Sequence, residues 1–258
     1  AENLLEELDE LISTTPFRHF VFNDDTFTAD RERIVKLAQG IMTRGFRITF
    51  ECETRANLLD RELVALLRKA GLVRINIGIE SGDPEILKTL KNGITLEAVR
   101  ASLHLLKSFG IETRGSVMIG APYERKETVL RTLRFVRELK DLDQPYVNIA
   151  APYPGTIMRE MALRGEGGTR LLSSDYGSLI RYGSAVMEVN DLTAADLVRL
   201  QAWGLRRAYL QPGRLWYNLK RAGLRAGIMN SLAFMSSTLH TGRRQRFNDD
   251  ERLSSSEK

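Results

Sequence analysis

The feature that most constrains this chain is a regular alternation of short apolar segments with helical patterns. Five segments are short and rich in β-branched or aromatic residues, which predicts strands at residues 19–22, 46–51, 73–79, 112–120 and 145–151. Their centres lie about 30 to 40 residues apart, room for a strand, a helix and two loops. This rhythm predicts an α/β fold with a parallel sheet, either a barrel or an open doubly wound sheet. No G-x-G-x-x-G follows the first strand, which weakens the dinucleotide-binding version.

Composition narrows the class of protein. The chain has 258 residues, of which 43% are hydrophobic, enough for a sizeable core. It has no apolar run of the length that a membrane span needs, and its start lacks the order of a signal peptide, so we expect a soluble, cytoplasmic protein. The single cysteine, Cys52, excludes an internal disulfide and any thiolate cluster built from this chain alone. The histidines His19, His104 and His240 lack ligand-like spacing, which disfavours a zinc site.

All five predicted strands run into polar, charged or Gly/Pro-rich residues. These ends are residues 23–27, 51–55, 80–83, 120–124 and 152–156. In a barrel and in an open parallel sheet alike, ligands gather at the carboxyl ends of the strands. One charged strand end means little, because Glu80 alone could equally cap the helix expected to start near Pro84. Five such ends together favour a binding site.

The segments at these ends resemble the radical S-adenosylmethionine (radical SAM) superfamily. The resemblance covers about residues 1–165 and is carried by "NDDTFTAD", "INIGIESGDPEIL" followed by "KNGIT", "GSVMIGAPYERKETV" and "PYPGT". It points to the cobalamin-dependent branch, which includes porphyrin ring cyclases and hopanoid methylases. It implies a partial parallel (β/α) barrel of TIM type that lacks its first strand and has a helical C-terminal extension. The strand ends would then bind S-adenosylmethionine.

The resemblance assigns residues to the methionyl part of that cofactor. Asp24 and Asp25 occupy the place of a Gly-Gly-Glu motif that meets the amino group, although the two glycines are absent here. Glu51 matches an acidic residue near the bound cofactor. Lys91 lies where a basic residue can face the methionyl carboxylate.

Other residues are assigned to the nucleoside part. Glu80, with Ser81 beside it, is placed where the ribose hydroxyls bind, and two hydroxyls donating to one carboxylate form a strong pair. Gly120 and Pro122 match a segment whose backbone lies beside adenine, where a side chain would block close approach. Glu124, in the same segment, is as readily a carboxylate in the first turn of a helix. The resemblance assigns no catalytic residue and no metal ligand in this chain.

The enzymes that the chain resembles hold a 4Fe-4S cluster in a C-x-x-x-C-x-x-C loop, and one cysteine cannot replace three. We therefore expect the chain to be truncated before that loop, and to be inactive alone. The implied reaction generates a 5'-deoxyadenosyl radical for methyl transfer, cyclisation or oxidation of an organic substrate, with cobalamin as a further cofactor. Two other classes stay open: a cluster-less barrel acting as scaffold or partner subunit, and a phosphate-handling barrel, which the acidic strand ends disfavour.

The carboxyl-terminal third has a different character. The pattern predicts a barrel over 1–163, a Gly/Ser-rich linker over 164–191, a helical region over 192–240 and a disordered tail over 241–258. Ten Lys or Arg and no Asp or Glu lie between Arg199 and Phe247. The favoured interpretation is a helical cap packed on the barrel. The more specific interpretation is a basic amphipathic surface that contacts an anionic membrane and serves a lipid-like substrate. Nucleic acid is the weaker partner, because no binding motif accompanies the charge.

Overall fold

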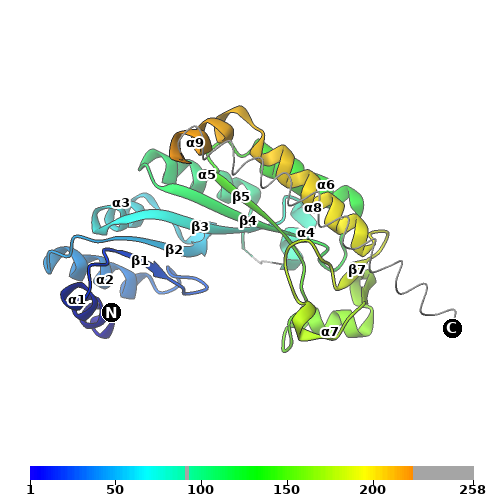
Figure 1. Ribbon diagram of the computed structural model, residues 1–258, viewed down its shortest axis with the longest axis horizontal. Coiled ribbons are helices and arrows are strands. Elements are labelled where there is room, and N and C mark those ends of the chain that lie inside the picture. The colour runs from blue at the N-terminus through cyan, green and yellow to red at the C-terminus, as the bar shows by residue number, and fades with distance from the viewer. Residues whose placement is uncertain (91–92, 223–258) are drawn as a thin grey trace. The chain divides into compact units, whose positions relative to one another are not determined.

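The structure, a computed structural model, describes residues 1–90 and 93–222. Its main sheet contains five parallel strands, β1 to β5, in sequential order (Figure 1). They are β1 (His19–Phe22), β2 (Thr49–Arg55), β3 (Leu72–Glu80), β4 (Glu112–Ile119) and β5 (Gln144–Ile149). Doubly wound sheets reverse their strand order at a switch point, whereas a barrel keeps the order of the chain. The sequential order therefore confirms the α/β class and is that of a barrel segment.

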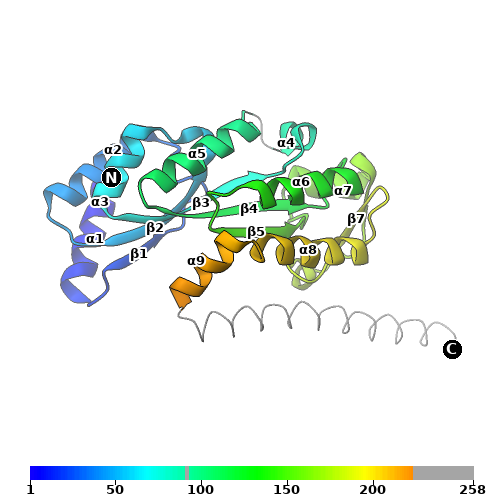
Figure 2. The same ribbon diagram turned by 90° about the horizontal axis from the view of Figure 1, so that it is seen from above.

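Helices connect the strands, as the parallel pairing requires. They are α1 (Glu2–Thr14), α2 (Arg31–Thr43), η1 (Ala56–Leu58), α3 (Arg61–Ala70), α4 (Pro84–Leu90), α5 (Leu96–Ser108) and α6 (Lys126–Glu138). Asp30, Asp60 and Thr95 cap α2, α3 and α5, each accepting a backbone N–H three residues later. α3 ends at Gly71, where φ is 114° and a Cβ atom would lie 2.3 Å from the carbonyl oxygen of Ile48. These caps fix where the three helices begin and where α3 ends. Figure 2 shows α2, α3 and α5 beside the strands of the sheet.

The chain divides into two compact units, which we describe separately. The first contains residues 1–80, 87–116 and 139–146, and the second contains residues 81–86, 117–138 and the chain from 147 onward. The first unit has an aromatic core in which the ring centroids of Phe22 and Phe27 lie 5.0 Å apart and those of Phe22 and Phe50 lie 5.3 Å apart. These rings pack beneath β1 and β2 and anchor the strands.

The predicted boundaries of β2 were wrong. The strand was expected over 46–51 but runs from Thr49 to Arg55, so Glu51 is its third residue and not its end. Phe50, Cys52 and Thr54 are buried, while Glu51 and Arg55 are partly exposed on the opposite face. Buried and exposed residues alternate along a strand even when the exposed residues are charged. In β2 this alternation continues past Glu51.

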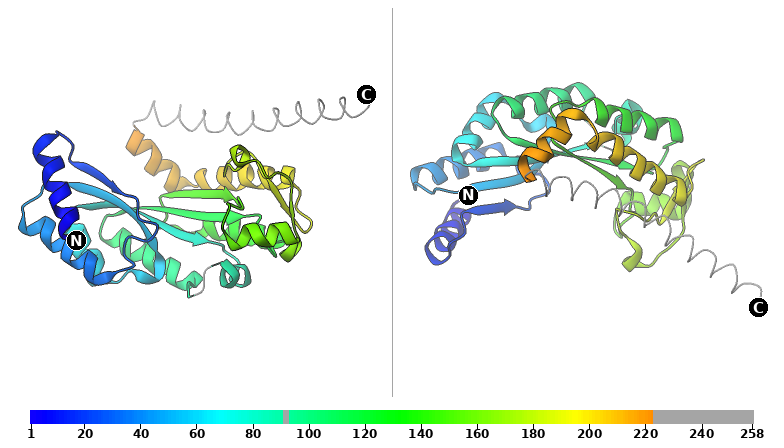
Figure 3. Two further views of the ribbon diagram at one scale, coloured as in Figure 1. Left: turned by 90° about the horizontal axis from the view of Figure 1, so that it is seen from below. Right: turned by 45° about the horizontal axis from the view of Figure 1, so that its top comes forward.

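The second unit contains the helices of the carboxyl-terminal third. They are α7 (Ile157–Arg164), α8 (Ala194–Tyr209) and α9 (Pro212–Ala222), with α7 packed beside β6 (Figure 3). α8 starts at a capping box in which Thr193 and Asp196 bond each other's backbone N–H groups. The predicted helical character of 192–240 is confirmed as far as residue 222. The rest of that region, and the tail over 241–258, lie outside the described residues.

The stretch 164–191, interpreted as a linker, contains ordered elements instead. It holds the antiparallel pair β6 (Thr169–Leu171) and β7 (Met187–Val189), and the short turns η2 (Glu166–Gly168) and η3 (Tyr176–Ser178). Three-residue strands are too short to give a hydrophobic alternation, which is why the Gly/Ser content dominated the prediction. Within the described residues, no helix combines the length and apolarity that crossing a bilayer requires.

Candidate active site

The carboxyl ends of β1, β2 and β3 lie at one edge of the first unit, because these strands pair in parallel. Asp24 follows β1 and forms an ion pair with Arg33, with 3.1 Å between Oδ1 and Nη1. Asp25, beside it, is exposed. Both aspartates are therefore at the predicted edge, with Asp24 held by α2 and Asp25 turned to solvent. Lys91 lies outside the described residues.

Glu80 ends β3 in a left-handed backbone conformation with φ of 64°. A residue with a Cβ atom pays about 1 kcal/mol or more for this conformation, which glycine adopts freely. Glu80 is partly buried at the edge of the unit. Glycine at this position would relieve the backbone strain. The presence of a glutamate instead indicates a role for its side chain.

A helix-capping role for Glu80 is contradicted by the structure. Asp83 caps α4, because its Oδ1 accepts the backbone N–H groups of Glu85 at 3.1 Å and Ile86 at 3.2 Å. The other oxygen of Asp83 lies 2.7 Å from Nη1 of Arg131, and Asp83 is buried. The cap of α4 is thus filled by a different carboxylate.

Ser81 is fully buried in the second unit. Its hydroxyl lies 3.0 Å from the hydroxyl of Thr132 and accepts the backbone N–H of Asp83. The N–H of Gly82 also donates to Thr132, at 2.9 Å, and a Cβ on Gly82 would lie 2.7 Å from the Cα of Thr132. The loop after β3 is thereby fastened onto α6. The hydroxyl of Ser81 is used within the protein, and its contact with a ligand stays a prediction.

Glu51 belongs to an ion network on the open face of the sheet. Its carboxylate accepts hydrogen bonds from Arg74 at 2.9 Å and from Arg114 at 2.9 Å, and lies 3.3 Å from Nε2 of His19. Arg74 also pairs with Glu112. Burial raises the pKa of Glu51, but the hydrogen bonds from Arg74 and His19 and the charges of both arginines outweigh it and hold the pKa below its usual value. Protein groups already satisfy the oxygens of Glu51. Its contact with a cofactor stays a prediction.

The segment from Gly120 to Glu124 forms a closed loop in the second unit. Gly120 has φ of 82°, and its N–H donates to Oε2 of Glu124 at 2.6 Å. The N–H of Ala121 donates to the same oxygen at 3.0 Å. Pro122 is buried, and a Cβ on Gly167 would lie 2.8 Å from it. Gly120 and Pro122 therefore form a rigid turn, and their contact with adenine stays a prediction.

Glu124 is completely buried, and its Oε1 has no hydrogen-bond partner among the described residues. Burial raises the pKa of Glu124 to about 8; the two backbone hydrogen bonds oppose this rise and the charge of Asp83 adds to it. The group is therefore protonated at neutral pH. It stabilises the loop as a neutral acid.

One residue that supports this loop was missed by sequence reasoning. Asn190 has φ of 49° and donates from Nδ2 to the carbonyl oxygen of Glu124 at 2.7 Å. The N–H of Tyr123 donates to the carbonyl oxygen of Gly167 at 2.7 Å. Contacts across such a chain separation leave no local signal, although an Asn in a Gly/Ser-rich stretch is typical of a left-handed turn position.

The described residues offer no place for an iron–sulfur cluster. Cys52 lies on the buried side of β2, and burial together with the charges of Asp24, Glu51 and Glu53 raises the pKa of its thiol, which opposes thiolate formation. Within residues 1–90 and 93–222, no group of three or more His, Cys, Asp or Glu side chains is arranged to hold a metal ion. A 4Fe-4S cluster therefore does not fit the residues that the structure describes.

Comparison with known proteins decides the family. Residues 1–136, more than half of the chain, match the radical SAM superfamily. The chain belongs to the radical SAM superfamily. An uncharacterized methyltransferase from Pyrococcus horikoshii is 30% identical over 209 residues, which cover 81% of this chain and 44% of the relative. The anaerobic magnesium-protoporphyrin IX monomethyl ester cyclase of Cereibacter sphaeroides is 24% identical, with 87% of this chain and 36% of the relative covered.

A solved radical SAM protein has the same fold. It is the methyltransferase TsrM from Kitasatospora setae, whose structure contains cobalamin and a 4Fe-4S cluster. The TM-score is 0.60 at 20% identity, and the match covers 70% of this chain and 38% of TsrM. The chain thus spans less than half the length of these relatives. The radical SAM family and the barrel-type fold predicted from the sequence are confirmed.

Proposed function

We propose that this chain supplies the S-adenosylmethionine-binding strand ends of a radical SAM enzyme that transfers a methyl group to an organic substrate. The observation that carries the proposal is Glu80, a carboxylate kept in a left-handed conformation at the end of β3. Neither a buried helix cap nor an uncharged turn would need a charged side chain at the end of β3. Asp83 caps α4, which supports a role for Glu80 other than that cap.

In this proposal Glu80 accepts hydrogen bonds from both ribose hydroxyls of the cofactor. A carboxylate can accept two O–H donors at once, and such charge-assisted bonds are about twice as strong as neutral ones. Asp24 and Asp25 follow β1 at the same edge of the first unit as the end of β3. Their negative charge suits the methionyl ammonium group, and the exposed Asp25 is the better placed of the two because Asp24 is paired with Arg33.

In the second unit, the resemblance assigns a contact with adenine to the backbone of Gly120 to Pro122. We propose this contact separately from those of the first unit, because glycine at the start of the turn leaves no side chain to block close approach. The neutral Glu124 beneath this turn holds the N–H groups of Gly120 and Ala121 in one position.

The cofactors supply the radical and methyl chemistry, and the chain binds and orients S-adenosylmethionine. The described residues do not fit a 4Fe-4S cluster, so we assign no step of the reaction to a cluster held by them. Cobalamin is part of the proposal because TsrM was solved with it bound. Methyl transfer is preferred to cyclisation because TsrM and the Pyrococcus relative are both named methyltransferases. A lone cysteine also suits the reducing cytoplasm that we propose for this protein.

Direct titration of the chain with S-adenosylmethionine tests this proposal without requiring turnover. Nuclear magnetic resonance should show saturable shifts of the amide signals that follow β1, β3 and β4. Absence of binding at millimolar cofactor would favour the other class, a cluster-less barrel that serves as a scaffold or partner subunit.

A further inference from the structure

A basic surface with exposed aromatic residues lies on the helices of the second unit. Trp203 and Arg207 of α8, and Leu210 directly after it, follow each other at spacings of four and three, which places them on one side of the helix. We call the following set the arginine–tryptophan face: Arg134 and Arg137 on α6, Trp203 and Arg207 on α8, and Leu210 at the end of α8. Trp216 on α9 is a further exposed aromatic residue.

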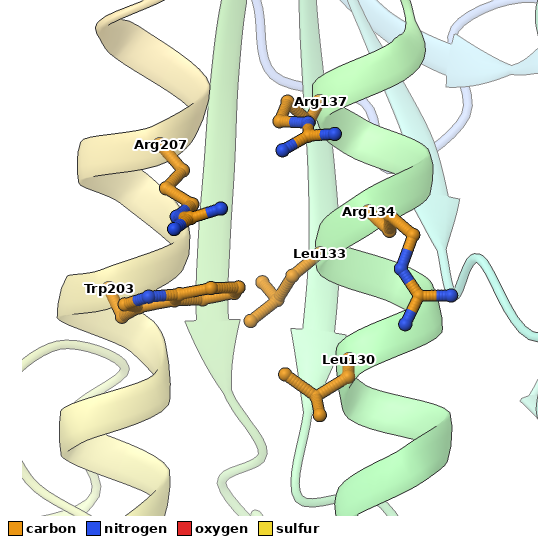
Figure 4. A pocket seen from close by; sticks show the side chains of 6 residues that line it. All are labelled: Leu130, Leu133, Arg134, Arg137, Trp203 and Arg207. Carbon is orange, nitrogen blue, oxygen red and sulfur yellow. The ribbon is translucent and has the colours of Figure 1, made fainter.

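Close packing of α6 and α8 builds this face. A Cβ atom on Gly204 would lie 2.4 Å from a terminal methyl carbon of Leu133, so glycine at this position makes room for the Leu133 side chain between the helices. Side chains from both helices then surround a pocket of about 110 Å³ (Figure 4). Leu130 and Leu133 form its apolar part, and three arginines with Trp203 form its sides.

The positive charge of the face is not neutralised by the described residues. Arg134, Arg137 and Arg207 are exposed, and none is ion-paired with a carboxylate of the part of the chain that the structure describes. Arg207 instead lies over the ring of Trp203, with its Cζ 4.7 Å from the ring centroid. Three neighbouring guanidinium groups repel one another, and an anion placed among them removes that repulsion.

Of the acidic residues near these helices, Glu138 follows Arg137 on α6, and two others lie at the opposite end of α8. A second pocket, which shares Leu130 and Trp203 with the first, is lined there by Asp191 and Asp196. Asp196 is engaged by Thr193 and by Arg199, at 2.5 Å. The anion-binding part of the surface is therefore restricted to the C-terminal half of α8 and the facing part of α6.

Exposed apolar side chains accompany these arginines. Trp203, Leu210 and Trp216 have 41%, 54% and 68% of their surface exposed. A free phosphate would explain the arginines but not the exposed apolar groups, and a helix C-terminus would explain the position of Arg207 alone. Tryptophan beside Arg or Lys is typical of surfaces that enter the headgroup region of a bilayer.

We propose that the arginine–tryptophan face docks peripherally on an anionic phospholipid bilayer. The arginines bind lipid phosphates, and Trp203, Leu210 and Trp216 enter the headgroup layer. The sequence complements this arrangement, because no Asp or Glu occurs between Asp196 and Asp249, so nothing in that stretch repels an anionic surface. A surface contact of this kind needs no membrane-spanning helix.

Tryptophan fluorescence provides a direct test, since Trp203 and Trp216 are the only two tryptophans of the sequence. Vesicles of phosphatidylcholine mixed with phosphatidylglycerol should shift the emission of the full chain to the blue, and brominated lipids should quench it. Pure phosphatidylcholine vesicles should do neither. Absence of a shift, or an equal shift with neutral vesicles, would overturn the proposal, as would binding to heparin or an acidic protein in the absence of vesicle binding.

A matched pair of triple variants separates this face from overall charge. The variant R134Q/R137Q/R207Q should lower partitioning onto the anionic vesicles by roughly tenfold or more, because each arginine near the surface contributes to binding. The control R18Q/R47Q/K69Q removes the same charge from exposed positions of the first unit and should bind nearly as wild type. Equal losses in the two variants would show that net charge alone governs binding and would overturn the assignment. Circular dichroism confirms that both variants fold.

Discussion

Oε2 of Glu124 lies 2.6 Å from the backbone nitrogen of Gly120, four residues earlier, inside a loop where the glutamate side chain has no exposed surface. The carboxyl group therefore closes its own loop, and Asn190 fastens that loop by donating to the carbonyl oxygen of Glu124. Rigidity of the turn at Gly120 and Pro122 thus depends on a buried acid.

The first prediction concerns the pH dependence of stability. Glu124 has a folded pKa of about 8, above its ordinary value of 4.5, so between these values the unfolded chain releases a proton that the folded chain keeps. The stabilising contribution is complete below the ordinary value and is lost as pH rises through 8. Glu124→Gln, which imitates the neutral acid, should remove a slope of up to about 1.4 kcal/mol per pH unit. Urea unfolding between about pH 5 and 8 measures it. Equal slopes in both proteins would contradict this account.

A second prediction concerns the ion network on the open face of the sheet. Arg74 and Glu51 are each only 13% exposed, so Arg74→Met should reduce the free energy of unfolding by about 2 kcal/mol or more. The loss should stay below that of a fully buried pair, because Arg114 still pairs with Glu51. Lys36→Met breaks an exposed pair with Glu32 and should have no measurable effect. Equal losses in the two variants would show that burial does not govern the Arg74 pair.

A third prediction compares two glycines with positive φ. Gly120 and Gly110 have φ of 82° and 65°, so alanine is strained at both. At Gly120 the added Cβ would also lie 2.9 Å from Leu197, whereas at Gly110 nothing lies within 4 Å. Gly120→Ala should therefore be less stable than Gly110→Ala by about 1 kcal/mol. Thermal unfolding of both variants checks the difference, and a larger loss at Gly110 would contradict the packing described for the loop.

The sequence predicts the main sheet well because its strands are apolar runs between helices of regular period. β3 is an example: Ile75, Ile77 and Ile79 are fully buried, as their spacing indicated. The predicted range of β2 was displaced because its outward residues include charged ones such as Glu51. Glu51 is bonded to a neighbouring strand, which the hydrophobic pattern does not reveal.

The candidate site was only partly predictable. The resemblance to the radical SAM superfamily identified Asp24, Asp25 and Glu80 as candidates, and in the structure they lie at one edge of the first unit. It could not show that Asp83 caps α4 or that the hydroxyl of Ser81 meets Thr132, 51 residues away. The contact of Ser81 depends on packing between segments that are distant in sequence, whereas the Asp83 cap is a local bond to residues two and three positions later. The strained backbone of Glu80 has no sequence signal either, since glutamate gives no warning of a positive φ.

The central claim is that Glu80 binds the ribose of S-adenosylmethionine, and an affinity comparison tests it most directly. Isothermal titration of the cofactor should show affinity roughly 10- to 100-fold weaker for Glu80→Ala, as expected for loss of charge-assisted hydrogen bonds. Glu62→Ala, a matched change at an exposed carboxylate on α3, should leave the affinity unchanged. Equal affinities for wild type, Glu80→Ala and Glu62→Ala would contradict the account.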